Sequence, residues 1–231
     1  MTRETLERET QSILDGVVTL ANMVEQAILD SVRSLQEKDF DLSKKIYDAD
    51  EEINQQRNHL EQETIELIAR QQPVASDLRI LAAVFEVITE LERMGDYAKG
   101  IAKVNLLIGE EPFIIPLDNI TKMAELTAGM LHRSIKAFYD KDAESAYKIP
   151  KEDDQVDKIY YSTYTELIHT IAKDPRRTDH ANRLMWVTHN LERTADRVTN
   201  LCERAIYIAT GKLEDLDASD DEDRLFEKGA D

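Results

Sequence analysis

Two nearly identical motifs, placed 100 residues apart, constrain the fold of this chain more than any other feature of the sequence. The first reads Leu-Glu-Arg-Met-Gly-Asp at 91–96, and the second reads Leu-Glu-Arg-Thr-Ala-Asp at 191–196. Both lie inside long helical patterns, so the two acidic residues of each motif lie on one helix face, about 6 Å apart at Cβ. Two carboxylates so placed repel each other unless a positive charge lies between or beside them.

Further matches show that the two motifs belong to a larger duplication. Asp50 and Asn54 align with Asp153 and Asp157 at an offset of 103 residues, and segment 63–69 aligns with 166–172 at the same offset. The smaller offset of the motifs fits a shorter connection in the second copy. The chain therefore contains two copies of one unit, with a period much longer than that of the familiar solenoid repeats.

Apolar residues recur at steps of three and four in six segments, which predicts six long helices. The expected helices cover 3–37, 41–71, 76 to a stop at Gly109, 118–140, 142–173 and 178–210. Asp39 or Asp41 is expected to cap the second helix. Pro73 and Pro175 end the second and fifth helices, because proline disfavours helical geometry in the preceding residue. The predicted fold is all-α, with two tandem, pseudo-symmetric three-helix bundles of antiparallel helices.

The predicted domain boundaries follow from the repeat. The first three-helix repeat covers 1–110, a linker covers 111–116, and the second repeat covers 117–213. Two of the five prolines lie at the linker, which favours an extended connection there. The remaining segment, 214–231, is acidic and lacks apolar periodicity, so we expect a mobile tail.

The net charge and the cysteine content limit which binding partners and which cellular compartment the sequence favours. The chain has 29 Lys and Arg against 47 Asp and Glu, and a net charge of −18 works against nucleic acid or an anionic membrane surface as partner. The single Cys202 excludes an internal disulfide, suggests a reducing compartment, and is expected to be a small buried apolar residue. The charged N-terminus lacks the apolar core of a signal peptide, and no run of about 18 apolar residues occurs. We therefore expect a cytoplasmic protein with no direct membrane insertion.

Acidic pairs are predicted to meet in two clusters, one in each repeat. In each repeat one pair lies roughly 20 residues before the hairpin turn and another roughly 20 after it, and antiparallel helices bring equidistant positions to one height. Oxygen ligands without Cys or His suit magnesium, calcium, manganese or oxidised iron better than a structural zinc. The candidate metal ligands are Asp50, Asn54, Glu92 and Asp96 in the first repeat, and Asp153, Asp157, Glu192 and Asp196 in the second.

Other interpretations of the acidic pairs stay open. Such pairs arise by chance in an acidic chain, and Arg93 and Arg193 could neutralise them as ordinary salt bridges. The carboxylates could also serve a metal-dependent enzyme or a metal store. An enzyme usually adds a general base, and no histidine is expected beside the clusters. One Glu-x-x-His, at Glu166 and His169, falls short of the two that a ferritin-like di-iron protein needs.

From about residue 5 to residue 213, the sequence resembles the PhoU family of phosphate-signalling regulators. The matching stretches are Arg-Gln-Gln-Pro-Val-Ala-Ser-Asp-Leu-Arg at 70–79, Glu-Leu-Glu-Arg-Met-Gly-Asp at 90–96 and Asn-Leu-Glu-Arg-Thr-Ala-Asp at 190–196. The paired acidic positions on the second and fifth helices match as well. Together these motifs are specific to the family.

The resemblance implies two PhoU domains, each a three-helix bundle, with multinuclear metal clusters held by Glu/Asp-x-x-x-Asp motifs on the domain surfaces. Candidate metals are iron, manganese, magnesium or zinc. It also implies a homodimer or higher oligomer, and a regulatory role rather than a catalytic one. The implied role is repression of the phosphate regulon when phosphate is plentiful, by bridging the phosphate ABC transporter ATPase to a sensor histidine kinase. Asn54 departs from the all-acidic pattern, which leaves the first repeat short of one carboxylate.

Overall fold

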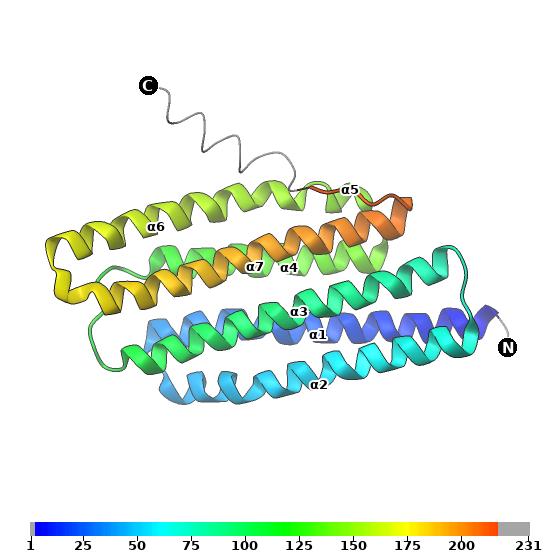
Figure 1. The fold of residues 1–231 in the computed structure, drawn as a ribbon, viewed down its shortest axis with the longest axis horizontal. Helices are drawn as coiled ribbons and strands as arrows, with labels where there is room; N and C mark the ends of the chain where they lie inside the picture. Colours follow the sequence, from blue (N-terminus) through cyan, green and yellow to red (C-terminus); the bar gives the residue numbers. More distant parts are fainter. Residues whose placement is uncertain (1–2, 217–231) are drawn as a thin grey trace, which may run out of the picture.

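The computed structural model describes residues 3–216, which form a bundle of long helices lying side by side (Figure 1). The first repeat consists of α1 (Arg3–Glu37), α2 (Phe40–Gln71) and α3 (Ser76–Ile108). The second repeat consists of α4 (Asp118–Asp140), α5 (Ala143–Ala146), α6 (Asp153–Lys173) and α7 (Thr178–Thr210), with short 3₁₀ helices η1 (Ile149–Glu152) and η2 (Pro175–Arg177). The described residues contain no strand. The predicted all-α fold of two three-helix repeats is confirmed.

The predicted fifth helix, 142–173, is wrong in its first third. The short helix α5 is followed by η1, and the long helix α6 begins only at Asp153. Pro150 in η1 explains the break, because proline has no backbone N–H for the carbonyl four residues earlier and disfavours the helical conformation before it. Asp153 therefore lies in the first turn of α6, where the helix dipole favours a negative charge.

Both ends of α2 follow their expected chemistry. The Asp39 side chain caps α2 by accepting a hydrogen bond from the Leu42 backbone N–H at 2.9 Å. Gln72 ends α2 in the left-handed conformation, with φ of 48°, directly before Pro73. Its backbone N–H donates to the Ile68 carbonyl, which satisfies one acceptor of the last turn. The resulting turn fixes which positions of α2 and α3 lie at equal height.

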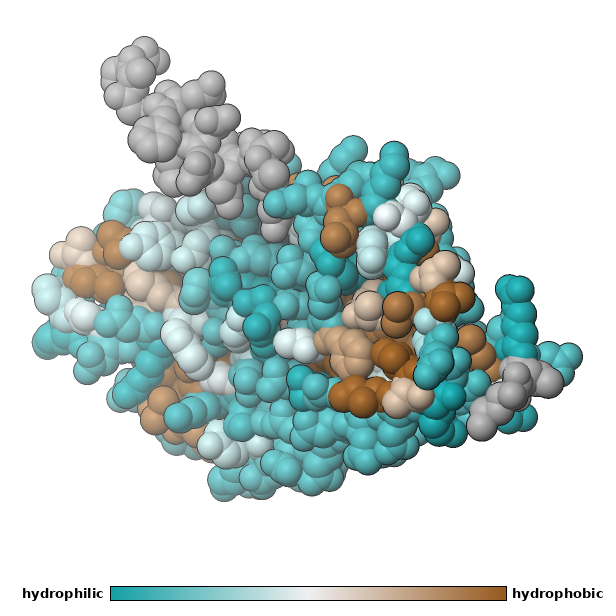
Figure 2. All heavy atoms as spheres, turned by 45° about the vertical axis from the view of Figure 1, so that its right-hand side comes forward, coloured by the Kyte–Doolittle hydropathy of each residue, from teal (hydrophilic) through white to brown (hydrophobic). Residues whose placement is uncertain are grey.

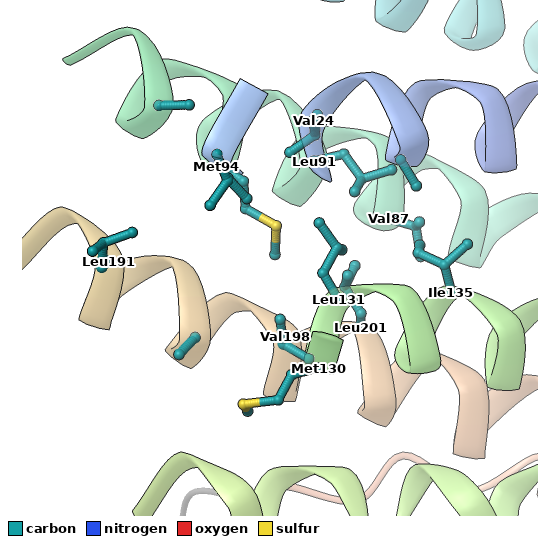
Figure 3. Packing of buried hydrophobic residues seen from close by; sticks show 14 of the residues in the cluster. Val24, Val87, Leu91, Met94, Met130, Leu131, Ile135, Leu191, Val198 and Leu201 are labelled. Atoms are coloured by element: carbon teal, nitrogen blue, oxygen red, sulfur yellow. The ribbon is translucent and has the colours of Figure 1, made fainter. Parts of the chain in front are cut away.

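The two repeats share one hydrophobic core, because α3 packs against α7 and α1 packs against α4. Figure 3 shows side chains of both repeats meeting there: Val24, Val87, Leu91 and Met94 from the first, and Met130, Leu131, Ile135, Leu191, Val198 and Leu201 from the second. Leu91 and Leu191, the leucines of the two motifs, are fully buried. Burial of one such side chain contributes about 1.5–3 kcal/mol, so each repeat stabilises the other.

By length and composition, α1 is apolar enough to cross a membrane, although it contains no unbroken apolar run of that length. Its apolar residues recur at helical spacing, and Val17, Leu20 and Val24 are buried in the shared core. Helix α1 also packs against α2, α3 and α4. Core packing therefore accounts for the hydropathy of α1.

Most of the face in Figure 2 is hydrophilic, with hydrophobic side chains gathered in patches. Val74, in the α2–α3 connection, is 72% exposed, and Leu213, after α7, is 65% exposed. These two segments lie at the same end of the bundle, because the Arg79 guanidinium near the start of α3 lies over the Tyr207 ring near the end of α7. Exposed apolar side chains thus occur at the hairpin end of the first repeat.

The last described residues, 214–216, contact the second repeat. The Tyr147 hydroxyl donates to Glu214 Oε2 at 2.6 Å, and the Leu216 backbone N–H donates to Glu203 Oε1 at 2.9 Å. The start of the predicted acidic tail is therefore attached to the bundle. The rest of that segment, 217–231, lies outside the described residues, and its predicted mobility stays a prediction.

Candidate metal centres

The first predicted cluster forms between α2 and α3. Asp50 is buried, with 4% of its surface exposed. Its Oδ2 accepts a hydrogen bond from Asn54 Nδ2 at 3.1 Å on the same helix, and another from Lys99 Nζ at 2.6 Å on α3. The Lys99 ammonium also lies 5.1 Å from the centroid of the Tyr47 ring. A protein ammonium group thus supplies the countercharge that a buried carboxylate requires.

Glu92 and Asp96 extend the first cluster from α3. Partial burial is the largest cause that raises the pKa of both carboxyls, because it removes some of the water that would stabilise their charged forms, although the Asp96 residue as a whole is exposed. Repulsion raises the pKa of Glu92 further, through Asp96 and then Asp50, and Asp50 also raises the pKa of Asp96. Lys99 opposes this effect at Asp96. Helices α2 and α3 therefore bring three carboxylates within electrostatic reach of one another.

The second predicted cluster lies between α6 and α7. Burial is the largest cause that raises the pKa of Tyr160 on α6, and the charges of Glu192 and Asp157 raise it further. The carboxylates of the two helices therefore lie near the same phenol. Asp153 lies one helical turn before Asp157, and its Oδ1 atom is buried. Asp196 lies one turn after Glu192, and its Oδ2 is 3.5 Å from Arg193 Nη1 on the same helix.

The expectation that no histidine lies beside either cluster is wrong, because His189 lies beside the second. Its Nδ1 lies 3.5 Å from Glu192 Oε2. Burial, as the largest cause, lowers the pKa of His189, and the charge of Arg193 lowers it further, so both favour the neutral imidazole. Only the neutral ring can offer a nitrogen lone pair to a metal. The i, i+3 spacing of His189 and Glu192 on one helix was the available signal.

The two clusters differ in how their negative charge is balanced. Lys99 has Thr199 as its equivalent at an offset of 100 residues, and Thr199 is a buried, uncharged residue. Asn54 has Asp157 as its equivalent at an offset of 103. The second cluster therefore has one carboxylate more and lacks the lysine at this position. Its oxygen donors match a hard cation better than those of the first cluster.

Within residues 3–216, no three Asp, Glu, His or Cys side chains are already arranged to hold a metal ion. In the second cluster, side-chain rotation would have to bring the oxygens of Asp153, Asp157 and Glu192 onto one ion. In the first cluster, a cation would also have to displace the Lys99 ammonium from Asp50. The donor chemistry fits a metal best between α6 and α7, and the metal role of the eight residues stays a prediction.

Fold and clusters together define a class of proteins: all-helical chains built from two tandem three-helix repeats, each carrying paired acidic motifs across its second and third long helices. The family model described as PhoU domain matches residues 17–104 and 120–205 of the chain. These two matched segments cover most of both repeats. The chain belongs to the PhoU family.

Similar proteins cover nearly the whole described chain. A phosphate-specific transport system accessory protein PhoU homolog of Clostridium acetobutylicum is 34% identical over 218 residues, covering 94% of this chain and 99% of that protein. The phosphate-specific transport system accessory protein PhoU of Escherichia coli K12 is 30% identical over 207 residues, covering 88% and 85%.

Two solved structures are similar over both repeats. The crystal structure of the phosphate transport system regulatory protein PhoU from Streptococcus pneumoniae matches with a TM-score of 0.85 at 30% identity, covering 91% of this chain and 100% of that chain. The crystal structure of PhoU from Pseudomonas aeruginosa matches with a TM-score of 0.84 at 27% identity, covering 89% and 99%.

Proposed function

We propose that this chain is a negative regulator of phosphate uptake and of phosphate-regulon signalling. In this role it acts as a cytoplasmic, homodimeric adaptor between the phosphate ABC transporter ATPase and a sensor histidine kinase. The observation that supports the proposal is the family match over both repeats, together with relatives named as accessory or regulatory proteins of phosphate transport. Long exposed helix faces and apolar side chains at one end of the bundle supply surface for partners.

Deletion of the gene tests the regulatory role. High-affinity phosphate uptake should stay switched on in rich phosphate, and the native gene should restore repression. Normal repression in the deletion strain would contradict the proposal. Affinity purification from cells grown at high and low phosphate tests the two partners, and sedimentation of the purified protein tests the homodimer.

We also propose that the two carboxylate clusters bind iron, manganese, magnesium or zinc cations. The supporting observations are that α2 and α3 gather carboxylates whose repulsion a cation would relieve, and that Asp157 of α6 and Glu192 of α7 lie near the same phenol, that of Tyr160. A bound cation would supply positive charge that holds the two helices together. The second cluster should bind more tightly, because in the first cluster Lys99 already neutralises Asp50.

Elemental analysis of matched variants tests the metal proposal. Glu192→Ala with Asp196→Ala should remove the tighter site, and Glu92→Ala with Asp96→Ala should remove the weaker one. Asp48→Ala with Glu52→Ala is the control, because this pair has the same spacing but is exposed on α2. Equal metal content in all these proteins would refute the assignment.

A turnover assay of the metal-loaded protein, together with the number of ions bound per chain, separates the alternatives. Metal-dependent turnover that is lost in Glu192→Ala would favour an enzyme, with His189 as the adjacent base. Storage would instead require many more ions per chain than two clusters of this size can hold.

A further inference from the structure

The contact between α3 and α7 has two stretches that the duplication makes equivalent, called here its two edges. They adjoin where Arg197 Nε donates to the Tyr97 hydroxyl at 3.4 Å, and charged side chains close one of them. On that edge, Glu90 of α3 accepts hydrogen bonds from Arg197 Nη1 at 2.8 Å and Asn200 Nδ2 at 3.3 Å. One turn earlier on α3, Glu86 pairs with Arg204 at 2.8 Å. These contacts join α3 to α7 and fill the space between them.

The other edge carries different residues and is hollow. The equivalents of Glu90, Arg197 and Asn200, at an offset of 100 residues, are Asn190, Tyr97 and Gly100. These three residues line a pocket of 490 Å³ between the helices. The ion pairs of the first edge are thus replaced by an open space, whose volume lies in the range of small-molecule sites.

Trp186 and Asn190 form part of the wall of this pocket. The Trp186 ring lies so close to Gly100 that a Cβ there would be 2.6 Å from the indole. Asn190 is 4% exposed, and its buried Nδ2 has no hydrogen-bond partner within residues 3–216. Buried polar atoms in native proteins are nearly always paired. An amide donor held without a partner at a pocket wall therefore points to a ligand that accepts its hydrogen bond.

Positive charge gathers around the pocket, although the chain has a net charge of −18. Lys99, Lys103 and Arg193 line it, against the single lining carboxylate of Asp96. Outside the lining, Lys99 pairs with Asp50, and Arg193 lies 3.5 Å from Asp196. Lys103 is exposed and forms no ion pair within the described part of the chain. Its ammonium group is therefore available for an anion from solvent.

Aromatic rings supply the remaining wall. Tyr47 from α2 and Trp186 from α7 line the pocket, and they are 43% and 46% exposed. Partly exposed aromatic faces of this kind stack on the bases of nucleic acids and nucleotides. An amide donor beside them can bond the edge of a base, as Asn side chains do in base recognition.

We propose that this pocket binds a mononucleotide. Lys103 and Arg193 bind the phosphate, an aromatic ring stacks on the base, and Asn190 Nδ2 donates to the base edge. This proposal goes beyond the proposed function, and it depends neither on the metal clusters nor on phosphate signalling.

The single tryptophan of the chain lines the pocket, so its fluorescence reports binding directly. The full chain is titrated with AMP in the presence of a chelator, which removes any metal held by Asp96. AMP should change the fluorescence saturably. Adenosine and inorganic phosphate should each bind at least about tenfold more weakly, a difference of about 1.4 kcal/mol.

Two variants and one control make the test specific. Lys103→Met should weaken AMP binding about tenfold. Lys122→Met removes the same charge from an exposed position on α4 outside the pocket lining, and should leave binding unchanged. Asn190→Leu should weaken AMP binding while raising the melting temperature, because it removes an unpaired buried amide.

Three results would overturn the proposal. The first is no saturable fluorescence change with AMP in the native chain. The second is equal AMP affinity in Lys103→Met and Lys122→Met. The third is inorganic phosphate binding as tightly as AMP, because the base would then contribute nothing.

Discussion

Lys99 Nζ and Asp50 Oδ2 lie 2.6 Å apart and join α3 to α2 inside the first carboxylate cluster. The aspartate is almost fully buried, whereas about a third of the lysine side chain remains accessible. The hydrogen bond that Lys99 donates to Asp50 is the largest cause that raises the pKa of Lys99, so the ammonium stays charged at neutral pH. The first cluster therefore contains its own cation, whereas the equivalent position of the second cluster is Thr199.

Replacing this lysine should cost stability. Lys99→Met should lower the free energy of unfolding by about 1–3 kcal/mol, because the buried Asp50 loses its charged donor. Lys44→Met is the control: Lys44 forms an exposed pair with Asp41 at 3.5 Å, and its loss should cost at most about 0.5 kcal/mol. Urea unfolding measures both. Equal effects of the two substitutions would show that the buried pair contributes nothing special.

Adding a carboxylate should turn the first cluster into a better metal site. Asn54→Asp, made in a chain whose second cluster carries Glu192→Ala and Asp196→Ala, should tighten Mn²⁺ binding by about tenfold. Asn58→Asp adds the same charge one turn further along α2 at an exposed position and should not. Calorimetric titration measures the affinities. A similar gain in both variants would mean that general charge, and not ligation at the cluster, attracts the ion.

The thiol of Cys202 should be inert in the folded protein. It is fully buried, and burial is the largest cause that raises its pKa to about 12, with Glu203 and Glu152 adding to it. Since the thiolate is the reactive form, a thiol-specific chromogenic reagent should label the native chain only at the rate of local opening. In denaturant one thiol per chain should react at once. A control variant, Thr165→Cys, places a thiol at an exposed position of α6 and should react quickly in the native state.

Acidification should destabilise the fold through His180. This residue is 7% exposed, and burial is the largest cause that lowers its pKa, with Glu111 opposing and Arg183 and Lys38 adding to the shift. The folded state therefore favours the neutral ring, whereas the unfolded chain takes up a proton near pH 6.5. The stability contribution is complete above that pH and is lost as the pH falls through it towards the folded pKa.

Matched variants isolate this effect. The loss of unfolding free energy between about pH 7.5 and about pH 5.5 should be smaller in His180→Gln than in the native chain. His59→Gln removes an exposed histidine and should keep the native pH dependence. If His180→Gln follows the native curve, the buried imidazole is not the group that titrates.

Local patterns were enough to predict most of the fold. The duplicated motifs and the apolar periodicity gave the helices and their antiparallel order, because both depend on residues close in sequence. Pro150 indicated the break, but the apolar pattern continued across it. The prediction of one helix over 142–173 therefore did not account for the backbone N–H that proline lacks. The approach of Asp50 to Glu92 and Asp96 followed from their equal distances to the turn.

The contacts that decide the character of the sites could not be predicted in this way. Whether Lys99 reaches Asp50 depends on the relative rotation of two helices, which no spacing along one helix fixes. The pocket at Asn190 depends on how α3 meets α7, and thus on the packing of residues about 100 positions apart. Such long-range packing is where sequence periodicity carries the least information.

The shared core has a consequence for how the chain came to differ between its halves. Alone, a three-helix unit would leave the apolar side of its third helix exposed to water. Pairing with a second copy of itself would bury that side. The present chain is in this sense a covalently fused dimer. Fusion removes the requirement that both partners be identical, so one half could acquire Lys99 where the other has Thr199, and Glu90 could face Arg197 while Asn190 faces an open pocket. The pocket therefore lies where the two halves no longer match, whereas most of the proposed metal ligands lie where they still do.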